Sequence, residues 1–173
     1  KIGAVEMAAF CVSYHPGKTP AMTGLDLPFL PLPTFDVQRE VHEAYYRHPA
    51  VVKEMRSWNA EAIFSNLLQQ YEFLGTGDPP RELDDWKGMR VRATGGLGDA
   101  MRLLGATPTS VAAPEVYTAL ERGMVSAAAF PFTTAHVSFR LHEVAKWFTS
   151  NLNPGVLNCP LVVNRDALAR LPA

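Results

Sequence analysis

The chain has 173 residues, of which 47% are hydrophobic and 19% are charged, and its net charge is −1. This composition is typical of a globular protein and too apolar for intrinsic disorder, and no apolar run approaches the ~20 residues that a membrane-spanning helix needs. Acidic and basic residues are interspersed, so we expect neither nucleic-acid binding nor binding to an anionic membrane surface.

Sequence patterns in the first part of the chain predict short strands and helices. The predicted elements are a strand over residues 4–12, helices over 34–47 and 49–55, and an apolar segment over 60–68. The Pro-rich segment 25–33 is incompatible with a regular helix or a central strand. We expect it to cross a surface in an extended form and to bury its apolar side chains, Leu27, Phe29 and Leu30.

The second part of the chain alternates strands and helices more regularly. Strands are predicted over residues 71–74, 89–94, 109–111, 126–132, 146–149 and 156–163. Helices are predicted over residues 97–104, 114–122 and 133–144, with one more beginning near Asn164. The alternation indicates βαβ units and therefore an α/β fold with largely parallel sheets, in which ligands bind beyond the carboxyl ends of the strands.

Arg92 is the strongest candidate for a binding residue. It lies near the carboxyl end of a predicted strand, directly before the Gly-rich segment Thr94–Asp99 and a helix. The planar guanidinium matches a carboxylate with two hydrogen bonds, and backbone N–H groups at a helix start are available to an anion. Arg90 has the same strand parity, so only one of the two needs to point inward. For either arginine the alternative is a surface or inter-helix ion pair.

No catalytic, metal or cofactor site is expected. The segment Thr94–Asp99 lacks the full G-x-G-x-x-G spacing, and both His-Glu pairs, at residues 42–43 and 142–143, lack the second histidine of a zinc-protease helix. His15 follows Cys11 by four residues, but no third group that would orient a Cys–His nucleophile is apparent. One alternative remains open, an α/β enzyme that uses the Gly-rich turn for a phosphorylated cofactor.

The two cysteines, Cys11 and Cys159, are too few for a disulfide framework. They could equally be two buried free thiols, because free cysteines are often buried, and the sequence leaves their state open. The chain begins and ends abruptly, at Lys1 and Ala173, which suggests an internal piece of a longer protein. The lack of a signal segment therefore says nothing about secretion.

Several segments together resemble the DctP-type solute-binding proteins of TRAP transporters. They are Trp86–Arg92, Gly105–Pro108, Glu115–Gly123, Phe139-x-x-His142-Glu-Val144, Leu161–Asn164 and, more loosely, Tyr14-x-Pro-Gly followed by Leu27–Leu30. The resemblance implies two α/β lobes that enclose a small organic acid in the periplasm and deliver it to membrane permease subunits, without enzymatic activity. It places residues 1–70 in a first lobe, 71–155 in a second, and 156–173 in a crossover strand and the start of a following helix.

The resemblance also implies that Arg92 is the arginine that binds the ligand carboxylate. The backbone at Thr94, Gly95 and Gly96 is expected to assist. Further candidates for the pocket wall are Tyr14, His15, Phe130, Phe132 and Asn158.

Two departures from the family pattern affect the expected ligand. Residues 126–131 lack the acidic-Gly and Glu-Asn residues of sialic-acid-type members, and the region near Tyr71 and Glu72 offers no second arginine. An aromatic or branched acid is therefore favoured over a sugar acid. A ligand-sensing domain of similar architecture is a further alternative to a transport receptor.

Overall fold

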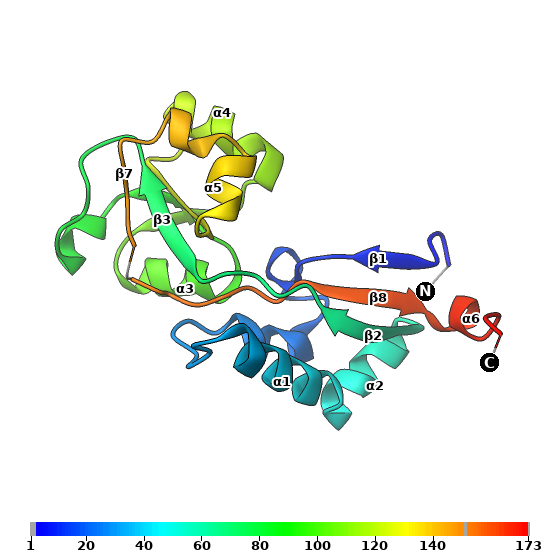
Figure 1. The fold of residues 1–173 in the computed structure, drawn as a ribbon. Helices are drawn as coiled ribbons and strands as arrows, with labels where there is room; N and C mark the ends of the chain where they lie inside the picture. Colours follow the sequence, from blue (N-terminus) through cyan, green and yellow to red (C-terminus); the bar gives the residue numbers. More distant parts are fainter. Residues whose placement is uncertain (1–2, 151, 173) are drawn as a thin grey trace. The chain divides into compact units, whose positions relative to one another are not determined.

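The computed structural model describes residues 3–150 and 152–172, which form two compact units (Figure 1). The first unit contains the chain up to Asp26, residues 31–68, and the chain from Leu157 onward, and the second contains Leu27–Leu30 and Gln69–Val156. Each unit has its own sheet and its own helices. The predicted two-lobed α/β class is confirmed.

The first unit is built on a three-stranded sheet in the order β1-β8-β2, with both pairings antiparallel. Its strands and helices are β1 (Met7–Ala9), α1 (Phe35–Tyr46), α2 (Pro49–Ser57), β2 (Ala60–Ser65), β8 (Pro160–Asn164) and α6 (Arg165–Leu168), with 3₁₀ helices at Val12–Tyr14 and Pro20–Asp26. The strand that completes the sheet comes from the far end of the chain. Sequence-distant segments therefore share one core.

Helices α1 and α2 pack along β2 (Figure 1). The Thr34 side chain accepts a hydrogen bond from the Val37 N–H at 3.2 Å, which satisfies a donor at the start of α1, and Pro49 occupies the first turn of α2. The buried cluster between these helices and the sheet comprises Val12, Met22, Leu25, Tyr46, Val51 and Met55. Apolar burial of this kind is the main stabilising term for the unit.

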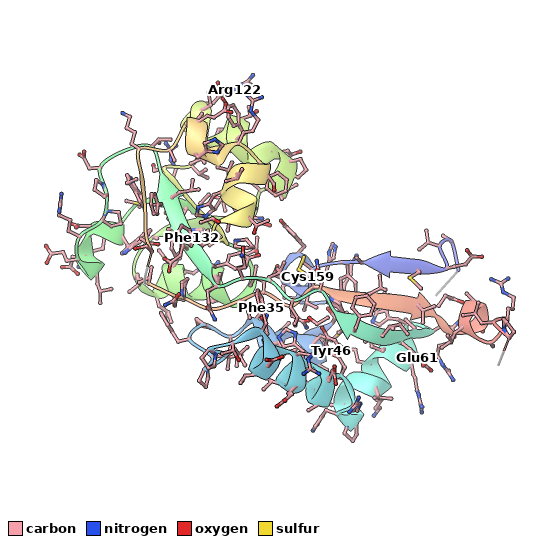
Figure 2. All side chains as sticks on the ribbon, in the orientation of Figure 1. Phe35, Tyr46, Glu61, Arg122, Phe132 and Cys159 are labelled. Carbon is pink, nitrogen blue, oxygen red and sulfur yellow. A yellow bond between two sulfur atoms is a disulfide. The ribbon has the colours of Figure 1, made fainter. Side chains whose placement is uncertain are left out.

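The state of the two cysteines, which the sequence leaves open, is a disulfide between Cys11 and Cys159 (Figure 2). Cys11 follows β1 and Cys159 precedes β8, and backbone hydrogen bonds flank the pair, from Phe10 N–H to Pro160 O and from Val12 N–H to Asn158 O. The two cysteines are 148 positions apart in the sequence. Only the pairing of β1 with β8 brings them together, and no local sequence pattern records that pairing.

Reduction of this disulfide is expected to lower the free energy of unfolding by about 2–4 kcal/mol, because the cross-link closes a long loop and so restricts the unfolded chain. Urea denaturation of the oxidised protein, the reduced protein and the Cys11→Ser/Cys159→Ser variant measures the effect. The reduced protein and the double variant should agree with each other. An oxidised protein no more stable than these two would contradict the prediction.

The second unit is built on a five-stranded sheet in the order β5-β4-β6-β3-β7. Its strands and helices are β3 (Tyr71–Gly75), β4 (Arg90–Arg92), α3 (Gly95–Leu103), β5 (Thr107–Thr109), α4 (Val116–Glu121), β6 (Ala127–Pro131), α5 (Thr134–Ser138) and β7 (Trp147–Phe148). Short 3₁₀ helices lie at Leu83–Trp86, Ala113–Glu115 and Leu141–Glu143.

The expectation of largely parallel sheets holds only for β5, β4 and β6. Strand β4 lies between the other two and is parallel to both. Strand β3 is antiparallel to β6 and to β7, and the first unit's sheet is wholly antiparallel. The physical reason is chain routing. Strand β3 begins the main segment of the second unit, and β7 lies near the point where the chain returns to the first unit. The neighbours β3 and β7 therefore run in opposite directions.

Two local predictions also need correction. Leu27 and Phe29 are exposed, at 54% and 65%, rather than buried, although Leu30 is half-buried. The Phe29 N–H donates to Pro154 O at 2.9 Å, so a backbone contact rather than side-chain burial holds this segment. The predicted helix over residues 133–144 ends early, at Ser138, because Arg140 adopts a left-handed conformation with φ 57°.

Gly75, the last residue of β3, lies opposite Trp147 of the antiparallel neighbour β7. A Cβ at this position would overlap the Trp147 ring and would lie 2.6 Å from the backbone oxygen of Ser126. That oxygen accepts a hydrogen bond from the Thr76 N–H at 3.0 Å, so moving it would disturb the backbone. Gly75→Ala is expected to destabilise the protein by about 1–3 kcal/mol through overpacking, as measured by thermal or urea unfolding.

Gly77 provides a matched control two residues away, because nothing lies within 4 Å of the Cβ that alanine would add there. Gly77→Ala should change the stability by no more than about 0.5 kcal/mol, as is usual for a surface substitution. Equal effects of the two substitutions would show that the close contact between Gly75 and Trp147 does not limit the packing.

Candidate functional site

Arg92 ends β4, a strand that lies inside the sheet between β5 and β6. Its side chain is buried, with only 2% of the residue exposed. The Nε–H donates to Val111 O at 3.1 Å and Nη1 donates to Ala129 O at 2.9 Å. The guanidinium carbon lies 4.2 Å from the centroid of the Phe130 ring, over its face. A permanently charged group is thus held in one orientation within the second unit.

Arg90, on the same strand, has a different role. Its side chain is exposed and its Nη2 donates to Gly123 O at 2.6 Å, just beyond the carboxyl end of α4. A cation near the last carbonyls of a helix is stabilising. The structure thus separates the two arginines that strand parity alone left equivalent.

The Gly-rich segment forms the start of α3, two residues earlier than predicted. Thr94 is the residue before the helix and is buried, and Gly95 and Gly96 are the first helical residues. Gly95 has φ 56°, a conformation that a side chain disfavours. The amino end of a nine-residue helix therefore follows Arg92 after only two residues, and its first N–H groups have no carbonyl acceptor within the helix.

The two phenylalanines proposed for the pocket wall lie in the same unit but in different settings. Phe130 is 3% exposed and belongs to the core against α4 and α5. Phe132 is half-buried, and its ring stacks on Phe148 with centroids 5.7 Å apart. The Phe132 ring also meets the ring of His136 edge-on at 5.5 Å.

His136 and Glu72 are buried polar residues of this unit that the sequence did not single out. Burial lowers the pKa of His136, although the backbone of Glu72 and Phe130 opposes the shift, so the imidazole is mostly neutral at neutral pH. The Glu72 carboxylate accepts hydrogen bonds from the Thr149 hydroxyl and from the N–H groups of Leu152 and Asn153. It thereby anchors the segment that follows β7.

The other predicted site residues lie in the first unit. His15 is exposed and Tyr14 is half-buried at the end of a 3₁₀ helix. Asn158 is fully buried: its Oδ1 accepts from the Tyr46 hydroxyl and its Nδ2 donates to Met22 O at 3.2 Å. These bonds engage both ends of the Asn158 amide inside this unit.

Asp26 lies beside Asn158 and is 1% exposed. Its Oδ1 accepts from the Asn158 N–H at 2.5 Å, and its Oδ2 has no hydrogen-bond partner among the described residues. Burial raises the pKa of Asp26 to about 7, and burial also raises the pKa of Tyr46 to about 12. His42 is equally buried in α1; its Nδ1 lies 2.6 Å from Ser65 Oγ, and burial lowers its pKa to about 4.

Two other kinds of feature are absent from the described residues, 3–150 and 152–172. No group of three or more His, Cys, Asp or Glu side chains in this part of the chain is placed to hold a metal ion. No helix of the same residues is long and apolar enough to cross a membrane.

Comparison with known proteins identifies the family. The model of DctP, the bacterial extracellular solute-binding protein family 7, matches residues 1–173. A solute-binding protein of Albidiferax ferrireducens is 29% identical over 178 residues, which cover 98% of this chain and 50% of the relative. The chain therefore spans about half the length of this relative.

Solved structures share the fold. A TRAP periplasmic solute-binding protein of Xanthobacter autotrophicus Py2, with bound β-D-galacturonate, superposes with a TM-score of 0.82 at 24% identity, covering 99% of this chain and 56% of that one. DctP7 of Bordetella pertussis, a receptor that binds pyroglutamic acid, gives 0.84 at 23% identity, covering 99% and 55%. A TRAP protein of Desulfovibrio salexigens with bound orotic acid gives 0.84 at 24% identity, covering 98% and 54%. This chain belongs to the DctP family of bacterial extracellular solute-binding proteins.

Proposed function

We propose that this protein is the periplasmic receptor of a TRAP-type secondary transporter, which binds a small organic acid through Arg92 and delivers it to the membrane permease subunits. The family consists of extracellular solute-binding proteins rather than enzymes. The Cys11–Cys159 disulfide supports the location, because disulfides persist in oxidising compartments such as the periplasm.

The observation that carries the proposal is the geometry of Arg92. A buried guanidinium at the carboxyl end of an inner strand, fixed by two backbone carbonyls and an aromatic face, is preorganised for a planar anion. Burial also reduces the screening of its charge. The helix start at Thr94, Gly95 and Gly96 adds N–H groups next to the arginine in the chain and is proposed to assist.

The ligands named for the solved relatives agree with a carboxylate-binding receptor. β-D-Galacturonate, pyroglutamic acid and orotic acid differ in size and polarity, but each carries a carboxyl group. We propose the same ligand class for this protein. Residues 126–131 carry no acidic or amide side chain that would bind sugar hydroxyls, so we propose an aromatic or branched acid rather than a sugar acid. The accessible residues Tyr14, His15 and Phe132 remain proposed parts of the pocket wall.

A thermal-shift panel tests this function. The protein is screened against aromatic, branched-chain and cyclic carboxylic acids, sugar acids, and a set of nucleotides. A saturable rise in Tm with at least one organic acid, and none with nucleotides, is the expected result. A response to nucleotides alone would contradict the receptor function, and the strongest response to a sugar acid would overturn the proposed preference for an aromatic or branched acid.

A further inference from the structure

Phe130 occupies a particular place beside Arg92. Strands β4 and β6 run parallel with Arg92 opposite Ala128, so Phe130 lies two residues further along β6 and its side chain projects from the same face of the sheet. The guanidinium carbon of Arg92 lies 4.2 Å above the centre of the Phe130 ring. The ring is therefore the surface on which the guanidinium rests.

The rest of the Phe130 ring is enclosed by the core. The residue is 3% exposed, and its ring lies 5.6 Å from the ring of Phe139 at an interplanar angle of 45°. The same buried cluster also contains Leu74, Ala128 and Ala135. A side chain packed in this way has little mobility and little surface to offer directly to a ligand.

We infer that Phe130 is a positioning residue that acts on the ligand through Arg92 rather than by contact. This inference rests on the proposed function, in which Arg92 binds the ligand carboxylate. The bonds to Val111 O and Ala129 O fix two nitrogens of the guanidinium, and the ring fixes the tilt of its plane. An aromatic face also attracts the cation without offering an acceptor oxygen that would compete with the carboxylate.

The test substitutes the ring and measures both Arg92 and the ligand. In the Phe130→Leu variant we expect the Kd for the carboxylic acid to rise about 3- to 10-fold, the range that corresponds to loss of order in one long side chain. The Kd for the corresponding primary amide should not change. In the ligand-free variant, NMR should show faster hydrogen exchange at the Arg92 Nε–H. If this variant does not fold, Phe130→Met replaces it, because methionine adapts to core gaps.

Phe73→Leu is the matched control. Phe73 is a buried phenylalanine of the same sheet, and its ring lies 4.9 Å from the Trp86 ring. This control should lose stability, yet leave the acid affinity and the Arg92 Nε–H exchange as in the wild type. Wild-type affinity and exchange in Phe130→Leu would reduce Phe130 to a core residue and overturn the inference.

A double-mutant cycle separates positioning from direct contact. If Phe130 acts through Arg92, adding Phe130→Leu to Arg92→Ala causes no further loss of acid binding at millimolar ligand. An equal loss in both backgrounds would show that the ring contacts the ligand and would overturn the inference. Undiminished acid binding in Arg92→Ala would instead refute the proposed function. In that case, hydrogen exchange at the Arg92 Nε–H in Phe130→Leu would still show whether Phe130 orders the arginine side chain.

Discussion

Arg92→Ala is expected to weaken binding of the carboxylate ligand by at least about 30-fold, and by up to several thousand-fold. Removing one partner of a buried, hydrogen-bonded charge pair costs about 2–5 kcal/mol of binding free energy. Arg92 is 2% exposed and two of its nitrogens are fixed by carbonyls, so little water screens it and little ordering is needed when the ligand binds. Calorimetric titration with the best acid from the panel measures the loss.

Arg90→Ala is the matched control, since it removes the same side chain from the same strand. Arg90 is exposed and its Nη2 binds Gly123 O, so the loss should be a small change in stability with unchanged ligand affinity. Arg92→Lys keeps the charge but loses the planar fork and should bind between wild type and Arg92→Ala. Similar affinities in the Arg90 and Arg92 alanine variants would contradict a specific role for Arg92.

Asp26 and His42 are expected to give the first unit two opposite dependences of stability on pH. The folded-state pKa of Asp26 is raised from 3.8 to about 7, so the folded protein favours the protonated acid. Its contribution is most favourable below about pH 4 and is lost as the pH rises through 7. The folded-state pKa of His42 is lowered from 6.5 to about 4, so its contribution is fully present above pH 6.5 and is lost as the pH falls through 4.

Each shift corresponds to roughly 3–4 kcal/mol at about 1.4 kcal/mol per pKa unit. The two effects oppose each other between pH 4 and pH 7 and therefore partly cancel in the wild type. Urea unfolding of single variants separates them. As the pH is raised from 4 to 8, the free energy of unfolding of Asp26→Asn should increase relative to that of the wild type by about 3–4 kcal/mol. As the pH is lowered from 7 to 4, the free energy of unfolding of His42→Asn should increase relative to that of the wild type by about 3 kcal/mol.

The differences from wild type are the informative quantities, because contributions of all other titrating groups cancel. Variants that differ from the wild type by a constant amount across this pH range would show that neither side chain is held in its neutral form by burial. A reversed sign for Asp26→Asn would mean that the folded protein stabilises the carboxylate instead.

Local chemistry makes the second unit the easier half to predict. A β-rich run ending in an arginine, glycines at a helix start and Gly105 just after α3 define the β4-α3-β5 unit within about two residues of the observed bounds. The same local patterns single out Arg92 as the binding candidate. These signals are short-range, and short-range signals are what periodicity and turn chemistry encode.

The unpredicted features depend on residues that are distant in the sequence. Cys11 meets Cys159 through the β1–β8 pairing, and the Asp26 carboxylate meets the Asn158 N–H from the other end of the chain. The sequence marks Glu72 only as lying in a region without a second arginine, but Glu72 anchors the backbone at Leu152 and Asn153. Strand direction also depends on where the chain enters and leaves a unit, which a period of two does not reveal.

Phe130 shows which property of a candidate residue its sequence position does not determine. Its position on an apolar strand that ends in a proline suggests a ligand wall, and the core-packing alternative has equal support in the sequence. The structure places the ring beneath Arg92 and inside the core. A strand pattern alone does not distinguish this position from one that lines a ligand pocket. The alternation of side chains along a strand assigns Phe130 to one face of the sheet. What covers its ring depends on the length and direction of the Arg92 side chain, which that alternation does not specify.

The central claim is that Arg92 recognises a carboxylate, and one calorimetric comparison tests it most directly: titration of the best organic acid and its primary amide against the wild type and Arg92→Ala. The two ligands have nearly the same shape and differ in charge at the group that Arg92 is proposed to bind. We predict that the wild type binds the acid at least about 30-fold more tightly than the amide and that Arg92→Ala loses this preference. Equal affinity of the wild type for acid and amide, or an undiminished preference in Arg92→Ala, would contradict the claim.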